Sequence, residues 1–175
     1  KRPDVSSWLN KLSQTESPNP SFVFLICQVG SEGRCKAELA LHHPELKFSF
    51  GRPGLLTFKI DSNSPLQKSL MLKSAFARTY GFSDAMVPTD KLPETIGGLL
   101  ERLDTKLIHC WARAEQDAQL GEQTDPSAWK LPSLNISALR WNRNARSRET
   151  VIDLVEIDPG QWLVGYHFER NGSAA

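Results

Sequence analysis

Apolar and polar residues alternate along two limbs of the segment 150–168, with a short turn sequence between them. In the first limb Ile152 and Leu154 alternate with Asp153, and both limbs are rich in β-branched and aromatic residues. This composition and period are typical of half-buried strands. The intervening residues 158–160, Asp-Pro-Gly, favour a tight turn, because proline presets φ and glycine tolerates positive φ. The pattern predicts a β-hairpin that forms the centre of a sheet.

The same stretch is also similar to the glycine-rich loop after the first strand of an S-adenosylmethionine-binding Rossmann domain. The similarity rests on the order of Asp153, Pro159-Gly160 and Trp162. Such a loop needs small residues so that the backbone approaches the cofactor closely. Residues 155–157 are Val, Glu and Ile instead, and only thirteen residues follow Trp162, too few for a doubly wound domain. We therefore expect a hairpin here and no cofactor site in this chain.

The first half of the chain predicts an alternation of strands and helices. A continuous apolar run at 22–27 indicates a strand buried on both faces. A helix follows, with Ser31 as its N-cap and Pro44 as its terminator. The remaining expected elements are strands at 46–50 and 54–60, a short helix from Ser64 through Met71, and a strand at 75–80. This order is the ferredoxin-like βαββαβ pattern, a four-stranded antiparallel sheet with both helices on one face.

Outside this pattern the sequence predicts a lead, a linker and a second unit. Apolar residues at helical spacing between Val5 and Leu12 indicate a short amphipathic helix in a flexible lead. Residues 84–93 contain two prolines and are expected to be a linker. A helix at 94–103, a strand at 106–113 and the terminal hairpin follow. The predicted division is therefore a lead at 1–20, a ferredoxin-like domain at 21–83 and a second domain at 84–175, and the fold class is α+β.

Composition places the chain among soluble globular proteins and limits its electrostatics. Of the 175 residues, 39% are hydrophobic and 23% are charged, which suits one domain or two small ones. The net charge is +1, so any nucleic-acid binding must come from a local patch. No apolar run approaches the length of a bilayer span, and no signal-peptide pattern is present. We expect a cytoplasmic protein without a membrane partner.

Cysteines and histidines offer little catalytic chemistry at the sequence level. Cys27, Cys35 and Cys110 have no zinc-binding spacing, so we expect reduced thiols and no metal site. His109 and His167 lie in predicted strands, where they are expected to be satisfied sheet residues. The motifs of serine hydrolases, zinc proteases and P-loop enzymes are all missing from the sequence. We therefore predict no catalytic residue in this chain.

One local concentration of positive charge stands out. It contains four arginines within nine residues, interleaved with a tryptophan and two asparagines: Arg140, Trp141, Arg143, Arg146 and Arg148. Arginine pairs bidentately with phosphates and stacks on bases, and tryptophan offers a stacking face, so this is the composition of an RNA-contacting loop. The alternative is a solvated basic loop that balances the acidic residues between 115 and 125. Weaker RNA-contact candidates are Lys47, Arg52 and Arg78, each of which flanks or lies in a predicted strand.

A set of short motifs adds a family resemblance. The first strand leads into the pattern C-x-x-G-x-E-x-x-C-x-x-E at 27–38, Phe-Ala-Arg follows at 76–78, and Val-Gly-Tyr lies in the terminal hairpin at 164–166. In this order the residues resemble the N-terminal part of the RlmM-type methyltransferases, which 2′-O-methylate a cytidine of the large-subunit ribosomal RNA. The resemblance extends from Phe22 to about Ser173.

The resemblance implies a function for the whole parent protein and a smaller one for this chain. In that family a THUMP-containing N-terminal region presents RNA to a C-terminal FtsJ-like methyltransferase domain that holds S-adenosylmethionine. The second domain, 84–175, would then be a THUMP-like RNA-binding unit, shortened because residues 113–151 offer little helix. The expected partners are structured ribosomal RNA and the chain's own methyltransferase domain, which this sequence lacks together with its catalytic residues. A protein-interaction module without an RNA role remains the alternative, which the near-zero net charge favours.

Overall fold

The computed structural model describes residues 20–105, 107–113, 120–123, 140–141 and 150–168. Its elements, in chain order, are β1 (Phe22–Cys27), α2 (Glu32–His42), β2 (Leu46–Arg52), β3 (Leu55–Ile60), the 3-10 helix η1 (Pro65–Gln67), β4 (Ala77–Pro88), the 3-10 helix η2 (Thr89–Lys91), α3 (Leu92–Leu103), β5 (Leu107–Arg113), β6 (Leu120–Gln123), β7 (Arg140–Trp141), β8 (Thr150–Asp158) and β9 (Gln161–Phe168). The predicted N-terminal helix lies outside the described residues.

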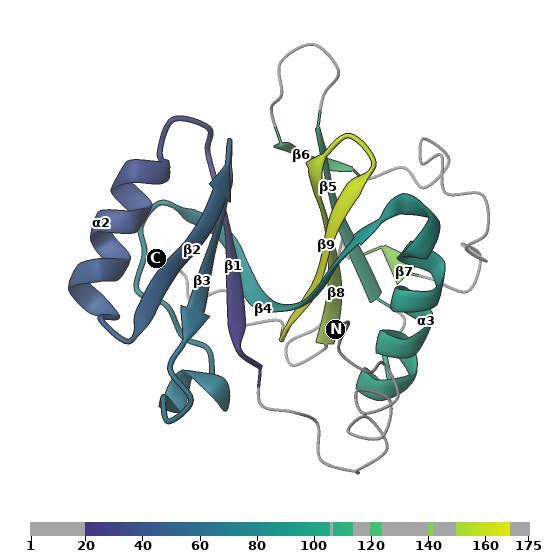
Figure 1. Cartoon of the computed structure of the whole chain (residues 1–175), viewed down its shortest axis with the longest axis horizontal. Coiled ribbons are helices and arrows are strands. Elements are labelled where there is room, and N and C mark those ends of the chain that lie inside the picture. The colour runs from purple at the N-terminus through teal and green to yellow at the C-terminus, as the bar shows by residue number, and fades with distance from the viewer. Residues whose placement is uncertain (1–19, 106, 114–119, 124–139, 142–149, 169–175) are drawn as a thin grey trace, which may run out of the picture.

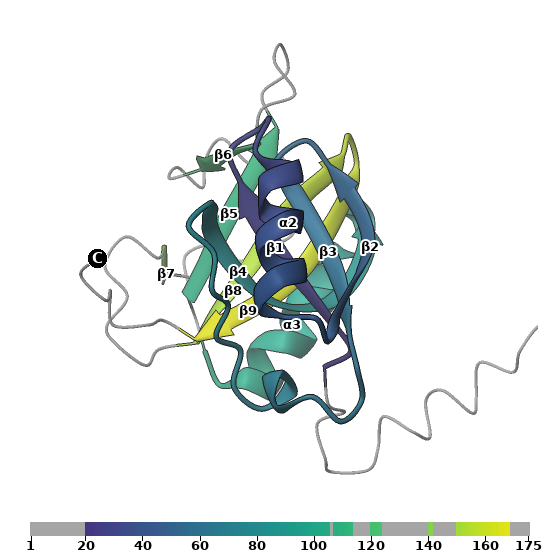
Figure 2. The same cartoon turned by 90° about the vertical axis from the view of Figure 1, so that its left-hand side faces the viewer.

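The strands form one continuous curled sheet in the order β2-β3-β1-β4-β9-β8-β5-β6, with β7 beside the start of β5. Helix α2 packs on the outer face of the β2-β3-β1 part, and α3 packs on the outer face of the β9-β8-β5 part (Figure 1). Figure 2, turned by 90°, shows α2 lying across β1 and β3. The architecture is therefore mixed α/β, with the two helices on the convex side of the sheet.

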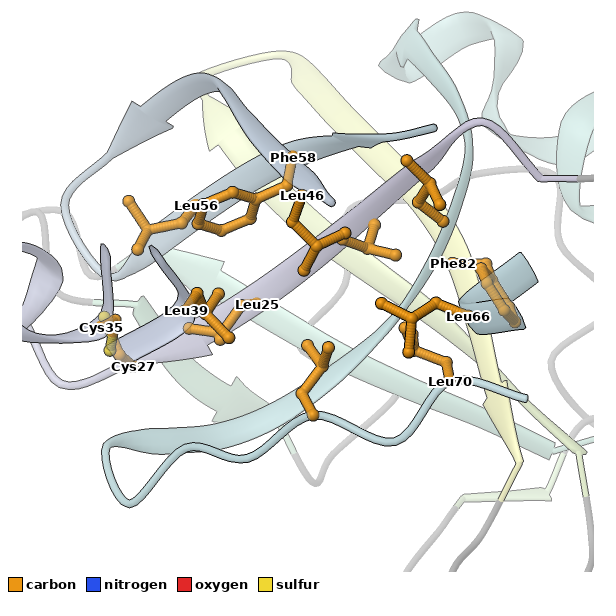
Figure 3. Close-up of a cluster of buried hydrophobic side chains, with 13 residues drawn as sticks. Leu25, Cys27, Cys35, Leu39, Leu46, Leu56, Phe58, Leu66, Leu70 and Phe82 are labelled. Carbon is orange, nitrogen blue, oxygen red and sulfur yellow. The ribbon is translucent and has the colours of Figure 1, made fainter. Parts of the chain in front are cut away.

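The strands predicted in the first half are confirmed, and one predicted helix is wrong. β2, β3, β1 and β4 lie side by side and pair antiparallel throughout. Between β3 and β4, however, the expected helix from Ser64 to Met71 is only the three-residue η1. Three leucines of this segment, Leu66, Leu70 and Leu72, are buried in the core beneath α2, the first two of which Figure 3 labels. Because the rest of the segment, 68–76, is neither helix nor strand, the predicted ferredoxin-like pattern lacks its second helix.

Strand β4 is longer than the sequence predicts. It continues to Pro88, so the predicted linker at 84–93 is wrong: its first half is strand, and η2 and the start of α3 follow directly. The first part of β4 pairs with β1 and the second part pairs with β9, with a register shift between Ser83 and Ala85. The strand thus crosses the predicted boundary between residues 83 and 84; the division into two domains stays a prediction.

The terminal hairpin is confirmed. β8 and β9 pair antiparallel from Thr150–Phe168 to Asp158–Gln161, and Gly160 in the turn has φ of +79°. β5 pairs parallel with the other edge of β8. The hairpin is more deeply buried than its alternation suggests: Val151 to Val155 are all buried, including Asp153. Both faces are covered because α3 packs on one side and the folded-back sheet packs on the other.

The sheet folds back on itself around Phe24. This fully buried side chain belongs to an inner core, separate from those beneath the helices: Phe24, Ile26, Leu55, Trp111, Leu120, Val155, Ile157 and Leu163. Phe24 lies over two glycines, Gly81 in β4 and Gly165 in β9. A Cβ at Gly165 would lie 2.7 Å from the Phe24 ring and would overlap the Phe82 carbonyl oxygen, and a Cβ at Gly81 would overlap the Tyr166 carbonyl oxygen. Only glycine permits this close approach.

Hydrogen bonds and an ion pair join the β2–β3 turn, near one edge of the sheet, to the end of β5 and the tip of the β8–β9 hairpin. Arg113 at the end of β5 donates from Nη1 to the Pro53 carbonyl oxygen at 2.8 Å and from Nε to the Ile157 carbonyl oxygen at 2.7 Å. Arg52 pairs with Asp158 at 3.2 Å. The β2–β3 turn is therefore fixed against the tip of the β8–β9 hairpin.

The motif at 27–38 has a clear structural role. Ser31 occupies the N-cap position of α2 but makes no capping side-chain hydrogen bond. Instead Glu32 accepts from the backbone N–H groups of Gly30 and Gly54, both at 2.8 Å. Glu38 accepts from the Ser74 hydroxyl at 2.6 Å and the Ala75 N–H at 3.0 Å. The two glutamates thus connect α2 to the β2–β3 turn and to the segment before β4.

Adding a methyl group under Phe24 should be costly. We expect Gly165→Ala to destabilise the protein by about 1 to 3 kcal/mol or more, because the new Cβ has no room against Phe24 and the Phe82 carbonyl. Gly97→Ala, on an open position of α3 with nothing near its Cβ, should instead stabilise the protein by about 0.5 to 1 kcal/mol. Urea unfolding of both variants measures the difference, and equal stabilities would contradict the close approach.

Candidate nucleic-acid interface

The arginine-rich segment begins at an edge of the sheet. Arg140 and Trp141 form β7, whose backbone pairs parallel with Leu107 and Ile108 at the start of β5. The sequence predicted a loop for both residues. This prediction is wrong, because both residues form a short strand that pairs with β5. The other members of the predicted set, Arg143, Arg146 and Arg148, lie outside the described residues. What the structure adds is the position of Arg140 and Trp141 beside the start of β5.

Arg78 lies on the inner side of the fold. Its neighbours Ala77 and Thr79 pair with Cys27 and Ile26, so Arg78 is the additional residue of a β-bulge. A bulge redirects side chains locally, and here the exposed guanidinium lies 5.0 Å from the centroid of the Trp111 ring in β5. Arg78, one of the three weaker candidates from the sequence, is thereby placed against an aromatic ring in cation–π geometry.

Arg52 and Lys47 are not brought together with β7. Arg52 pairs with Asp158 and lies near Arg113, at the end of β5 opposite to β7. Lys47 lies on β2, the far edge of the sheet, and forms an exposed ion pair with Asp61 at 3.7 Å. Both cations therefore have local structural partners away from the β7 edge.

A buried polar cluster lies across β5, β8 and β9. Asp153, with no exposed surface, contacts His167 Nδ1 at 2.6 Å and His109 Nδ1 at 3.6 Å. The His109 ring also packs against Trp111, with centroids 5.0 Å apart. Sequence reasoning treated the two histidines separately and did not join them through Asp153. The available signal was an acid within a run of buried β-branched residues, where only a paired carboxylate is tolerated.

Electrostatics keep this carboxylate ionised. Burial alone would raise the pKa of Asp153, but the charge and hydrogen bond of His167, together with the nearby His109 ring, outweigh it, so the pKa is lowered. The arrangement holds a negative charge inside the sheet, directly beside the His167 ring.

The pKa values of the cysteine thiols are shifted in the opposite direction, which keeps the thiols uncharged. Burial is the main cause that raises the pKa of Cys27 to about 12, with Cys35 beside it (Figure 3), and the pKa values of Cys35 and Cys110 are also raised. All three cysteines are free and buried. A thiol that stays protonated is a poor nucleophile, so these cysteines serve as small apolar core residues.

The residues that resembled a cofactor loop pack into the fold. Val155 and Ile157 belong to the inner core, and Glu156 accepts from the Arg113 backbone N–H at 2.6 Å. Within the described part of the chain, no group of three or more His, Cys, Asp or Glu residues has the geometry to hold a metal. No described helix combines the length and apolar character required to cross a membrane.

Comparisons with known proteins give only distant structural similarity. The chain matches no known family model and no curated protein. Its structure is similar to a 4-thiouridine synthetase solved in complex with RNA and bound ATP, with 14% identity and a TM-score of 0.44 over 86% of this chain. It is also similar to PH1313 from Pyrococcus horikoshii Ot3, with 9% identity and a TM-score of 0.44 over 87% of this chain. The chain spans 42% of the synthetase and 56% of PH1313.

The buried Asp153 predicts an acid-sensitive fold. Because its pKa is lower in the folded state, its stabilising contribution is present above the unfolded value of about 4 and is lost as pH falls through the folded value. Asp153→Asn should cost about 3 to 5 kcal/mol at neutral pH, since it removes one partner of a buried ionic cluster. The variant should also show a shallower loss of stability on acidification.

Urea unfolding between about pH 3 and pH 7 measures this effect. Asp90→Asn, at an exposed position in η2, is the matched control and should follow the unmodified protein. Parallel stability curves for Asp153→Asn and the unmodified protein would show that Asp153 is not the acid-sensitive group.

Proposed function

We propose that this chain binds structured RNA, and that it is the substrate-presenting region of an S-adenosylmethionine-dependent ribosomal RNA 2′-O-methyltransferase. The observation that carries the RNA-binding part is the arginine-rich segment that begins in β7, beside the start of β5. Arg140, Arg143, Arg146 and Arg148 supply phosphate contacts, and Trp141 supplies a stacking surface.

The position of β7 supports this proposal physically. Contacts built on a strand are held more precisely than contacts on a loop, and Arg140 and Trp141 pair with Leu107 and Ile108 of β5. Local concentration of arginine also suits a chain whose net charge is only +1, because a local patch attracts phosphates without a global basic field.

The finer part of the proposal rests on the resemblance of the motifs at 27–38, 76–78 and 164–166 to the RlmM-type enzymes. In this proposal a methyltransferase domain outside this sequence holds S-adenosylmethionine and carries out the reaction. The present chain orients the RNA. Its hairpin does not fit the cofactor, because Val155 and Ile157 fill the inner core where a cofactor loop needs small residues.

A protein-interaction module is the second candidate. The observation that favours it is the edge strand β2, on which Phe48 is 47% exposed. Exposed aromatic residues on sheet edges are typical of surfaces that pair with another chain. Here Lys36 Nζ lies 3.8 Å from the Phe48 ring centroid, so part of this surface is already covered.

RNA binding should depend on salt through the arginine-rich segment. Each phosphate that an arginine neutralises contributes about 0.7 to 0.9 to the slope of log affinity against log salt. Replacing Arg140, Arg143, Arg146 and Arg148 by alanine should therefore flatten the slope by about three units. Fluorescence anisotropy with a ribosomal RNA fragment at several salt concentrations measures it.

The matched control removes the same charge elsewhere. Lys59, Lys68, Lys73 and Lys91 are all exposed in the structure, and their quadruple alanine variant should keep most of the slope. Trp141→Ala should weaken binding without changing the slope, because stacking releases no counterions. An unchanged slope in the arginine variant would remove this segment from the interface, and no binding by the unmodified chain would favour the interaction module.

A further inference from the structure

The guanidinium of Arg78 is an unused cation within the described structure. It is exposed and lies 5.0 Å from the Trp111 ring centroid, but it forms no ion pair or hydrogen bond with any described residue. Arg52 and Arg102, by contrast, each have a carboxylate partner, Asp158 and Asp84 respectively. A guanidinium has five N–H donors and no acceptor, so Arg78 retains its whole capacity to bind an anion.

The ring that Arg78 contacts carries a second donor without an acceptor, the indole N–H of Trp111. The residue is only 3% exposed, and its indole Nε1 is buried with no hydrogen-bond acceptor among the residues described. A buried N–H without an acceptor is rare in folded proteins and calls for an explanation. Trp162 shows the usual arrangement, because its Nε1 donates to Thr89 Oγ1 at 3.1 Å.

Two carboxylates lie on β8, the strand beside Trp111. Asp153 contacts His167 at 2.6 Å with one oxygen, and its other oxygen lies 3.6 Å from His109. Glu156, on the strand beside Trp111, accepts from the Arg113 N–H at 2.6 Å. One oxygen of Asp153 and one of Glu156 are thus paired with donors, whereas the Arg78 guanidinium and the Trp111 indole N–H have no hydrogen-bond partner among the described residues.

We propose that Arg78 and Trp111 form a phosphate-binding subsite on the inner side of the curled sheet. A phosphoryl group has several acceptor oxygens, so it can accept from the Arg78 fork and from the indole N–H together. The exposed, flexible side chain of Arg78 is the part that adjusts to admit the group. In the proposed RNA-binding function, on which this assignment of the ligand rests, the group is a backbone phosphate of the RNA.

Indole N–H resonances provide a direct test. In the ¹⁵N-labelled full chain, the Trp111 Nε1–H signal, identified by its loss in Trp111→Phe, should shift when a short single-stranded RNA is added. The Trp162 signal is the internal control and should stay in place, because its N–H already has an acceptor. A parallel titration with inorganic phosphate at constant ionic strength tests whether free phosphate alone shifts the Trp111 signal.

Two arginine variants make the test specific. Arg78→Gln should remove the shift and weaken RNA affinity about tenfold or more, because a charge-assisted contact is lost. Arg34→Gln is the matched control: this residue is also exposed and lies over an aromatic ring, that of Phe76 at 5.6 Å, and the variant should keep both the shift and the affinity. Arg78→Gln leaves the core intact, so the test does not depend on the folding of Trp111→Phe.

The outcomes separate this subsite from the proposed function. RNA binding that depends on the arginine-rich segment, with an unmoved Trp111 signal and full affinity in Arg78→Gln, would overturn the subsite alone. No RNA binding would overturn the proposed function. In that case an Arg78-dependent shift with inorganic phosphate would support a free-phosphate site, and a static Trp111 signal in both titrations would overturn the subsite as well.

Discussion

The contact of Phe24 with two glycines is the constraint on which the rest of the fold depends. Gly81 and Gly165 let the backbones of β4 and β9 approach the Phe24 ring, and this allows the sheet to fold back over an inner core. A flat sheet with the same strand order would leave the Phe24 face open to water. Instead the sheet has three layers of side chains: one beneath each helix and one inside the fold.

The folded-back sheet also explains what sequence patterns can and cannot supply here. Local patterns predicted the hairpin, α2 and the four antiparallel strands of the first half, because turn residues and apolar periodicity are local properties. The burial of Asp153 on the second face of β8 depends on β1 and β3 packing from far away in the chain. Periodicity contains no information about such a partner, so the hairpin was expected to be only half-buried.

The incorrect predictions share a similar cause. Ser64-Pro65 is a sound helix start, yet the helix ends after the three residues of η1. Leu70 and Leu72, two residues apart, are both buried beneath α2, and this spacing does not fit one face of a helix. Two prolines suggested a linker, but Pro88 ends β4 and Pro93 lies in the first turn of α3, both permitted positions. For the candidate interface, composition identified the arginine-rich segment, whereas the contact between Arg78 and Trp111 required the bulge and the curl. Neither the bulge nor the curl of the sheet can be predicted from the spacing of residues in the sequence.

The motif at 27–38 shows how a pattern that suggests a family can be structural. Its acids hold α2 through backbone N–H groups of Gly30, Gly54 and Ala75, and its cysteines fill the core. Residues of this kind maintain the fold, whereas the ligand that a protein binds depends on the residues at its surface site.

Strand β4 has a consequence for how the protein is made. Its first part pairs with β1, which precedes it, but Ser83 pairs with Gly165, far later in the chain. During synthesis the second part of β4 therefore has an unpaired edge until β9 emerges. An open edge of this kind invites pairing with other chains. Pro88, at the end of this part of β4, has no N–H to offer to a ladder, and a proline at a strand edge opposes such pairing.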